Sequence, residues 1–384
     1  MSARKIATWH EAGLIDAATR DRLLAYETAH ARPLALWAVF GIGALAIGLG
    51  LVSVIAANWE EIPGQLRLGV HLALIAGALA ALFLREQRLA ETSPWAVEAL
   101  VFVTAALGLT FFGHLGQVYQ TSSPLWQPLG AWLVLFAPLL LLTGRSWPTA
   151  LAVLCGAAWC AWDYAFAMTG YKAGTPGTAL LLWIAFVTAL PVLFAPVAAW
   201  LRGRGERPDF WRRLEQLALA YAVAGASFAT AVASGNGFGE GDGLVRDWSS
   251  MAVIGAVALL AGLGVMAVRP GTSGRMAGAI IAGAAVVPLL AYAVNDLAVP
   301  AALLFMVLWA GIAAAALVAH WRGVFQLAVA AIALRLIILS FELASDLLLS
   351  GFGLIVAGVL ILGVAWAAVK VSKRFAPRNT AAGA

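Results

Sequence analysis

The chain has 384 residues, of which 62% are hydrophobic and only 11% are charged, and its mean hydropathy is +0.90. Soluble domains contain roughly 45–50% apolar and about 25% charged residues, so this composition excludes a single water-soluble globular domain. The formal net charge of +5 would suit nucleic acid or a membrane, and its distribution along the chain, described below, favours a membrane.

The first thirty residues are polar and of mixed charge. They contain no apolar core region and no small-residue cleavage site, so we expect no cleavable signal peptide. The stretch KIATWHEAGLIDAATRDRLLAYE predicts a short helical hairpin, with Gly13 ending the first helix and Asp16 capping the second. Residues 1–32 are therefore expected to form a small cytoplasmic appendage.

The rest of the chain consists of apolar blocks of the length that a helix needs to cross a bilayer, about 18–25 residues. These blocks predict an all-α polytopic integral membrane protein. The twelve predicted spans cover approximately 34–57, 66–84, 95–115, 126–143, 148–168, 177–201, 214–234, 248–268, 276–294, 297–319, 324–347 and 350–369.

Lysine and arginine residues fall almost entirely on one side of this predicted topology. If the N-terminus is cytoplasmic, 20 of the 24 lie in inside segments, three lie outside (Arg67, Lys172 and Arg246), and Arg335 is intramembrane. This bias predicts a protein of the cytoplasmic membrane with both termini in the cytoplasm. The predicted organisation is a hairpin (1–32), a first six-helix half (33–201), a basic cytoplasmic loop (202–213), a second six-helix half (214–372) and a cytoplasmic tail (373–384).

An arginine interrupts the apolar run ALRLIILSFELASDLL near the end of the chain. Spacings of seven and eleven residues place Arg335, Glu342 and Asp346 on one face of a helix. A charge near mid-bilayer is costly and must face a partner or water. Two readings stay open: a buried ion pair that locks the helix into the bundle, or a site for an anion, a lipid headgroup or a proton.

Further polar residues gather at the predicted outer ends of spans and suggest a polar cavity that opens outward. They are Asn58, Trp59, His114, Gln117, Tyr119, Asp163, Asn295 and Asp296. The alternative for His114 and Gln117 is a hydrogen bond between helices. In the sixth span, the prolines of LPVLFAP are expected to kink or unwind the helix and free carbonyls to line a cavity.

Motifs of soluble catalysis are missing from the sequence. It contains no Walker A loop, no HExxH and no GxSxG, and no His and Cys residues at metal spacing. Cys155 and Cys160 are interpreted as small packing residues. We therefore predict neither a metal nor a cofactor, and no catalytic residue is assigned.

Several pieces occur together in an order that resembles a known family. WHEAGLID, AANWEEIPGQLR, GHLGQVYQ and LWQPLGAWLVLFAPLLLLTGRS follow one another over roughly residues 5–150. This arrangement resembles the bacterial predicted membrane proteins called domain of unknown function 2157. The resemblance implies a membrane protein of unassigned biochemistry, and a possible partner in a small membrane-anchored protein with a GDYxxLxY motif.

Three functions are compatible with these patterns. The first is binding or transport of a small molecule or lipid through the outward-facing polar cavity. The second is a non-transporting scaffold that assembles with a small partner exposed to the periplasm. The third is an intramembrane enzyme acting on lipid-linked substrates, with Asp163, His114 or Glu342 as acid or base. Membrane lipids are the expected partners in the first case, and nucleic acid is expected in none.

Overall fold

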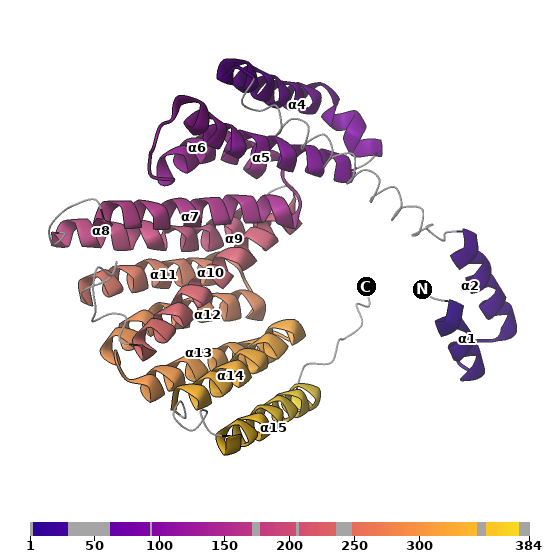
Figure 1. Cartoon of the computed structure of the whole chain (residues 1–384). Helices are drawn as coiled ribbons and strands as arrows, with labels where there is room; N and C mark the ends of the chain where they lie inside the picture. Colours follow the sequence, from indigo (N-terminus) through magenta and orange to yellow (C-terminus); the bar gives the residue numbers. More distant parts are fainter. Residues whose placement is uncertain are drawn as a thin grey trace. The chain divides into compact units, whose positions relative to one another are not determined.

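A computed structural model describes residues 3–29, 62–92, 94–170, 177–204, 207–235, 248–343 and 351–375. Within these residues the chain forms helices and no strand (Figure 1). The predicted all-α class is therefore confirmed. The chain divides into two compact units, Met1–Arg67 and Leu68–Ala384, which are described separately.

The described start of the first unit is the predicted helical hairpin. Helix α1 (Ala3–Glu11) and helix α2 (Ala17–Ala29) are joined by a turn in which Gly13 has a φ of +69°, a conformation that glycine adopts at little cost. Asp16 accepts a hydrogen bond from the backbone N–H of Thr19 at 2.9 Å, so it caps α2 as predicted. Hydrogen bonding to Thr19 lowers the pKa of the Asp16 carboxyl.

Long apolar helices make up the described part of the second unit and the last residues of the first. Their bounds are α4 (Gly64–Thr92), α5 (Pro94–Tyr119), α6 (Trp126–Thr143), α7 (Trp147–Gly170), α8 (Thr178–Ala189), the 3-10 helix η1 (Leu190–Leu193), α9 (Phe194–Arg204), α10 (Pro208–Ser234), α11 (Trp248–Val268), α12 (Thr272–Ala293), α13 (Ala298–Val318), α14 (Arg322–Leu343) and α15 (Gly351–Phe375).

Among the described residues, ten helical segments are long and apolar enough to cross a membrane, with α8, η1 and α9 counted as one. They correspond in order to the predicted spans from 66–84 to 324–347. The predicted span 34–57 lies outside the described residues, and the predicted span 350–369 falls on α15. A multi-pass membrane protein is thus confirmed, while the count of twelve and the cytoplasmic termini stay predictions.

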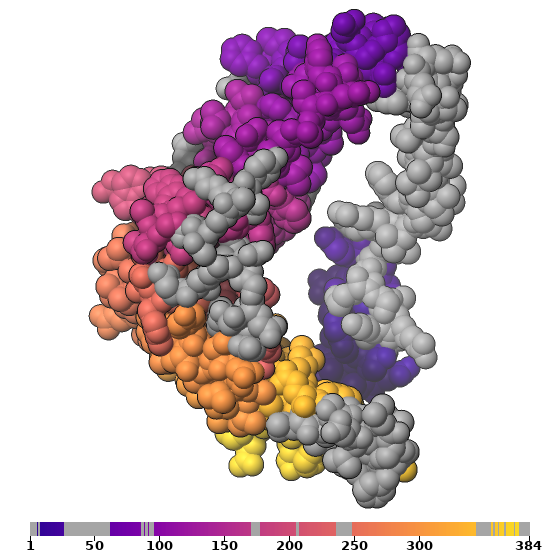
Figure 2. Space-filling model, turned by 60° about the vertical axis from the view of Figure 1, so that its left-hand side comes forward, coloured from indigo at the N-terminus to yellow at the C-terminus, as the bar shows by residue number. Residues whose placement is uncertain are grey.

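Many helices that follow one another in the second unit pack against one another, such as α5 with α6, α6 with α7 and α11 with α12. In Figure 2 the surface colour accordingly runs in chain order, from purple to orange, across this unit. The tightest pair is α11 and α12, where two glycines face each other. A Cβ added to Gly262 would lie 2.7 Å from the carbonyl oxygen of Gly278. Only small residues permit such an approach, as is usual between membrane helices. Helix α10 contacts α7, α9, α12 and α13 and lies at the centre of the packing.

Two local features differ from uninterrupted spans and loops. The predicted sixth span is broken by η1 at Leu190–Leu193, where Pro191 cannot donate a backbone hydrogen bond. Residues 202–213, expected to be a basic loop, are largely helical, because α9 continues to Arg204 and α10 begins at Pro208. Proline suits the first turn of a helix, and the arginines of that segment lie at helix ends rather than in a loop.

Candidate functional site

The ends of α6, α9 and α11 and the starts of α7, α10 and α12 carry many arginines, and we call this the basic end of the bundle. Arg207 donates hydrogen bonds to the carbonyl oxygens of Gly144 at 2.8 Å and Leu141 at 2.9 Å. Arg213 donates to the carbonyl oxygen of Arg145. These contacts satisfy a carbonyl in the last turn of α6 and the two that directly follow the helix. Arginines of the 202–213 segment therefore hold helices together.

A buried carboxylate lies within this basic end. Glu215 of α10 is only 3% exposed and forms ion pairs with Arg202 at 3.2 Å and Arg269 at 2.7 Å. One arginine ends α9 and the other follows α11, so the cluster joins three helices. A buried carboxylate requires such compensation, since an isolated charge would cost several kcal/mol. The sequence analysis did not single out Glu215.

Arg335 of α14 is buried, with 6% of its surface exposed. Its Nη1 donates to Oε1 of Glu342 at 2.8 Å, and its Nη2 donates to Oγ of Ser234 on α10 at 2.6 Å. Ser234 in turn donates to the carbonyl oxygen of Thr230 at 3.2 Å. The charge is thus neutralised within its own helix and anchored to the end of α10. Asp346 lies outside the described residues.

Asp163 of α7 accepts a hydrogen bond from the backbone N–H of Trp126 at 2.7 Å. Trp126 is the first residue of α6, and the first N–H groups of a helix have no partner within it. A carboxylate also interacts favourably with the positive end of the helix dipole. Asp163 therefore caps a neighbouring helix.

His114 of α5 pairs with His71 of α4, with 3.2 Å between their Nδ1 atoms. Nε2 of His71 lies 3.0 Å from the carbonyl oxygen of Leu107, which can only accept. In the neutral ring this nitrogen is therefore the donor, and Nδ1 of His71 accepts from Nδ1 of His114. The pair links two helices, as the alternative reading for His114 supposed. Gln117 and Tyr119 are exposed at the end of α5.

The remaining predicted residues lie in a turn or outside the described part of the chain. Asn295 and Asp296 form the turn between α12 and α13, where the N–H of Asp296 donates to the carbonyl oxygen of Ala233 at 2.9 Å. This turn and Arg335 both contact the end of α10. Asn58 and Trp59 lie outside the described residues.

The described candidates contact separate pairs of helices, and the outward-opening polar cavity stays a prediction. None of them lines either of two apolar cavities in the described part of the structure. The larger cavity, which we call the main cavity, has a volume of about 600 Å³ and is almost wholly apolar. It lies between α7, α8, η1, α10, α11 and α12, on their apolar faces.

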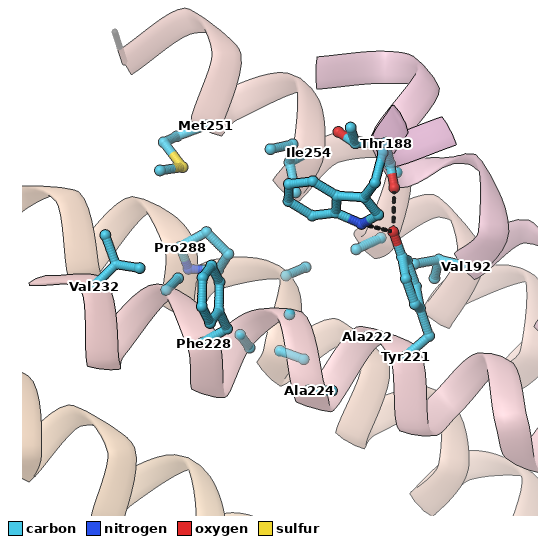
Figure 3. Close-up of a pocket in the computed structure, with 18 of the residues that line it drawn as sticks. Thr188, Val192, Tyr221, Ala222, Ala224, Phe228, Val232, Met251, Ile254 and Pro288 are labelled. Carbon is cyan, nitrogen blue, oxygen red and sulfur yellow. Dashed lines mark hydrogen bonds between the residues drawn. The ribbon is translucent and has the colours of Figure 1, made fainter. Parts of the chain in front are cut away.

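One side of the main cavity carries three hydrogen-bonded polar groups (Figure 3). Trp162 donates through Nε1 to the hydroxyl oxygen of Tyr221 at 2.9 Å, and that hydroxyl donates to the carbonyl oxygen of Thr188 at 2.6 Å. Thr188 lies just before η1, so the predicted exposure of a carbonyl near the prolines agrees with the structure. Phe228 and Met251 lie toward the other side of the cavity, away from Tyr221.

Small residues of α10 create the space. Ala222, Ala224, Gly225, Ala226 and Ala229 all line the main cavity. A Cβ added to Gly225 would meet no heavy atom within 4 Å. Ala224, Gly225 and Phe228 are also exposed, so the cavity opens on the surface of the bundle rather than only inside it.

Sequence reasoning missed this cavity because its signal is ambiguous. The run LALAYAVAGASFATAVAS contains a single tyrosine among small residues, and small residues in membrane helices usually indicate close packing. Here part of the run packs and part leaves space. No group of three or more His, Cys, Asp or Glu side chains within the described ranges could hold a metal ion.

Comparisons with curated proteins and with solved structures gave no match. The family model described as "Predicted membrane protein (DUF2157)" matches residues 7–149. That region contains the N-terminal hairpin, the histidine pair and the helix capped by Asp163, and the main cavity is formed mostly beyond it. Over residues 7–149 the chain is therefore similar to the DUF2157 predicted membrane proteins, as its motifs predicted.

Proposed function

We propose that this protein binds the apolar chain of a membrane lipid in the main cavity. The observation that carries the proposal is a cavity of about 600 Å³ with an apolar lining and an opening on the surface of the bundle. Ligand sites in proteins typically measure about 300–1,000 Å³ and combine apolar walls with a few placed polar groups. Tyr221 and its two partners supply those groups here.

The chemistry of the lining favours a hydrocarbon chain over a polar solute. Alanine, phenylalanine, methionine and proline side chains surround the space, and they offer nothing to replace the hydration of a charged substrate. The opening at Ala224, Gly225 and Phe228 faces the surroundings of a membrane helix, so a lipid would enter sideways from the bilayer. In the predicted orientation the cavity lies in the outer half of the membrane.

The arrangement of the polar residues favours binding over catalysis. An acid–base mechanism needs its groups within hydrogen-bonding reach of one reacting atom. Asp163, His114 and Glu342 instead contact α6, α4 and α14 respectively. Arg335 is paired within the protein, which favours a structural role for it over an anion site.

The test is to purify the full-length protein from native membranes in mild detergent and identify bound lipids by mass spectrometry. Gly225→Leu would add a side chain to the lining of the main cavity at a position where an added Cβ meets no heavy atom within 4 Å. Gly311→Leu is the matched control, because Gly311 of α13 is exposed, also has no atom within 4 Å of an added Cβ and lies outside the cavity.

We expect lipid with the wild type and the Gly311 variant and much less with the Gly225 variant. Equal amounts of lipid in all three proteins would contradict the proposal. A small protein that purifies with all three, in place of a lipid, would favour the scaffold function.

A further inference from the structure

A second cavity of about 390 Å³, which we call the side cavity, lies on the other side of the same wall. Thr188, Ala189 and Val192 face the main cavity, whereas Val187, Leu190 and Pro191 face the side cavity. Helix α7 also contributes to both spaces. Trp162 and Phe166 line the main cavity, and the side cavity is lined by Ala157, Cys160, Ala161 and Tyr164. The side cavity is completed by α6 and α9 and is a separate space.

Aromatic residues surround one end of the side cavity. Trp126 begins α6, and its ring meets that of Tyr164 edge-on at a centroid distance of 5.2 Å. The Tyr164 hydroxyl accepts a hydrogen bond from Nε1 of Trp183 at 3.1 Å. All three residues lie near the end of the bundle opposite the basic end, where tryptophan and tyrosine are favoured at a membrane interface.

From this aromatic end the side cavity runs along the helices toward the bilayer interior. Its lining on the broken span extends from Trp183 to Phe194, eleven residues or roughly 16 Å at 1.5 Å per residue. Apart from Cys160, the deeper residues are aliphatic, proline or phenylalanine. The space therefore has the length and the chemistry for part of a hydrocarbon chain that starts at the interface.

A buried donor at the aromatic end has no acceptor. Nε1 of Trp126 is buried and has no hydrogen-bond partner within the described parts of the chain. By contrast, the indole N–H groups of Trp132, Trp162 and Trp183 all donate to protein oxygens. Leaving a buried donor unsatisfied costs about 1–3 kcal/mol. Because Trp126 lines the side cavity and its Nε1 has almost no accessible surface, a small movement of the indole would bring this donor to a ligand oxygen and hold it there.

We propose that the side cavity binds an acyl chain of an ester lipid, with an ester carbonyl oxygen accepting the hydrogen bond from Nε1 of Trp126. An acyl ester places an acceptor directly at the start of a long apolar chain, which matches the donor at the aromatic end and the apolar space beyond it. The Asp163 carboxylate on the backbone N–H of Trp126 disfavours a second anion nearby. A neutral carbonyl therefore suits the site better than a phosphate or the carboxylate of a free fatty acid.

The experiment titrates the delipidated full-length protein with phosphatidylethanolamine of defined chains and counts bound lipids by native mass spectrometry. Trp126→Phe removes the N–H and keeps the ring. Trp159→Phe is the matched control, since Trp159 is 63% exposed and lies outside both cavities. Cys160→Leu reduces the space directly, because Cys160 lines the side cavity.

We expect Trp126→Phe to weaken one binding event about tenfold, the equivalent of one hydrogen bond of roughly 1.4 kcal/mol. Cys160→Leu should abolish that event, and Trp159→Phe should leave it unchanged. A free fatty acid should bind the wild type more weakly than the ester lipid. Unchanged binding in Trp126→Phe would overturn the proposal, because a water molecule would then satisfy the indole.

The proposals for the main cavity and for the side cavity can be refuted independently of each other. If both proposals hold, the wild type binds two lipids, Gly225→Leu removes one of them, and Cys160→Leu removes the other. A single lipid lost in Cys160→Leu but retained in Gly225→Leu would refute the proposed function and support the side cavity. The reverse pattern would refute the side cavity alone.

Discussion

Replacing Arg335 with leucine should destabilise the bundle by about 1–3 kcal/mol. The variant loses two charge-assisted hydrogen bonds, to Glu342 and Ser234, and each such bond contributes about 1.5–3 kcal/mol. Two effects reduce the loss. Leucine no longer requires the burial of a guanidinium, and the Glu342 side chain is already 32% exposed, so it can hydrate. Hydrogen bonds measured between membrane helices average only about 0.6 kcal/mol, which also favours the lower part of the range.

Thermal unfolding in detergent measures this effect, and a fall in Tm of a few degrees is expected. The control is a double-mutant cycle with Glu342→Gln. If the two side chains interact as the structure shows, the cycle should return a coupling energy of about 0.5–3 kcal/mol. An unchanged Tm together with zero coupling would refute the structural role. Unchanged stability combined with a loss of bound lipid would instead make Arg335 part of an anion site.

Four other changes have defined outcomes. Glu215→Leu should cost more than Arg335→Leu, about 3–5 kcal/mol by thermal unfolding, because two arginines lose their shared carboxylate. Asp163→Asn should keep a cap on α6 and its Tm, whereas Asp163→Leu should lose about 1 kcal/mol. The protection of α2 amides from hydrogen exchange, relative to their intrinsic rates at each pH, should fall as the pH falls through the lowered pKa of Asp16, because the stability that a depressed carboxyl pKa contributes is lost there. Reporter fusions after Arg145 and within 202–213 should read cytoplasmic, and a periplasmic signal would reverse the predicted orientation.

Within the described residues, the length and composition of the apolar blocks were enough to predict the helices. The predicted span 248–268 coincides with α11, and 126–143 coincides with α6, because helix ends in a membrane coincide with the ends of the apolar run. Helix α10 was predicted to start at residue 214 and starts at Pro208. Its first turns carry charged residues, so hydropathy does not assign them to a membrane span. In the structure the surrounding helices and carbonyls compensate those charges.

The candidate site was less predictable, because partners on other helices decide what a polar residue does. A spacing of seven residues was sufficient to place Arg335 and Glu342 on one face. Nothing in the sequence indicated that Asp163 would cap α6, or that Tyr221 would contact Trp162 and Thr188. Cavities are harder still to predict from a sequence, because the same small residues can either pack closely against a neighbouring helix or leave a space. Which of the two occurs depends on the neighbouring side chains.

The short 3-10 helix η1 also determines the direction in which the side chains of α9 point around the helix axis. A 3-10 helix turns by about 120° per residue and an α-helix by about 100°. Over the four residues of η1, the difference accumulates to about 80° of rotation, and the greater rise per residue adds roughly 2 Å of length. Arg202 of α9 reaches Glu215 at its observed angle. In a continuous α-helix the Arg202 side chain would point about a quarter-turn away from the Glu215 carboxylate. The four residues of η1, which lie between the two cavities, therefore also align the ion pairs at the basic end.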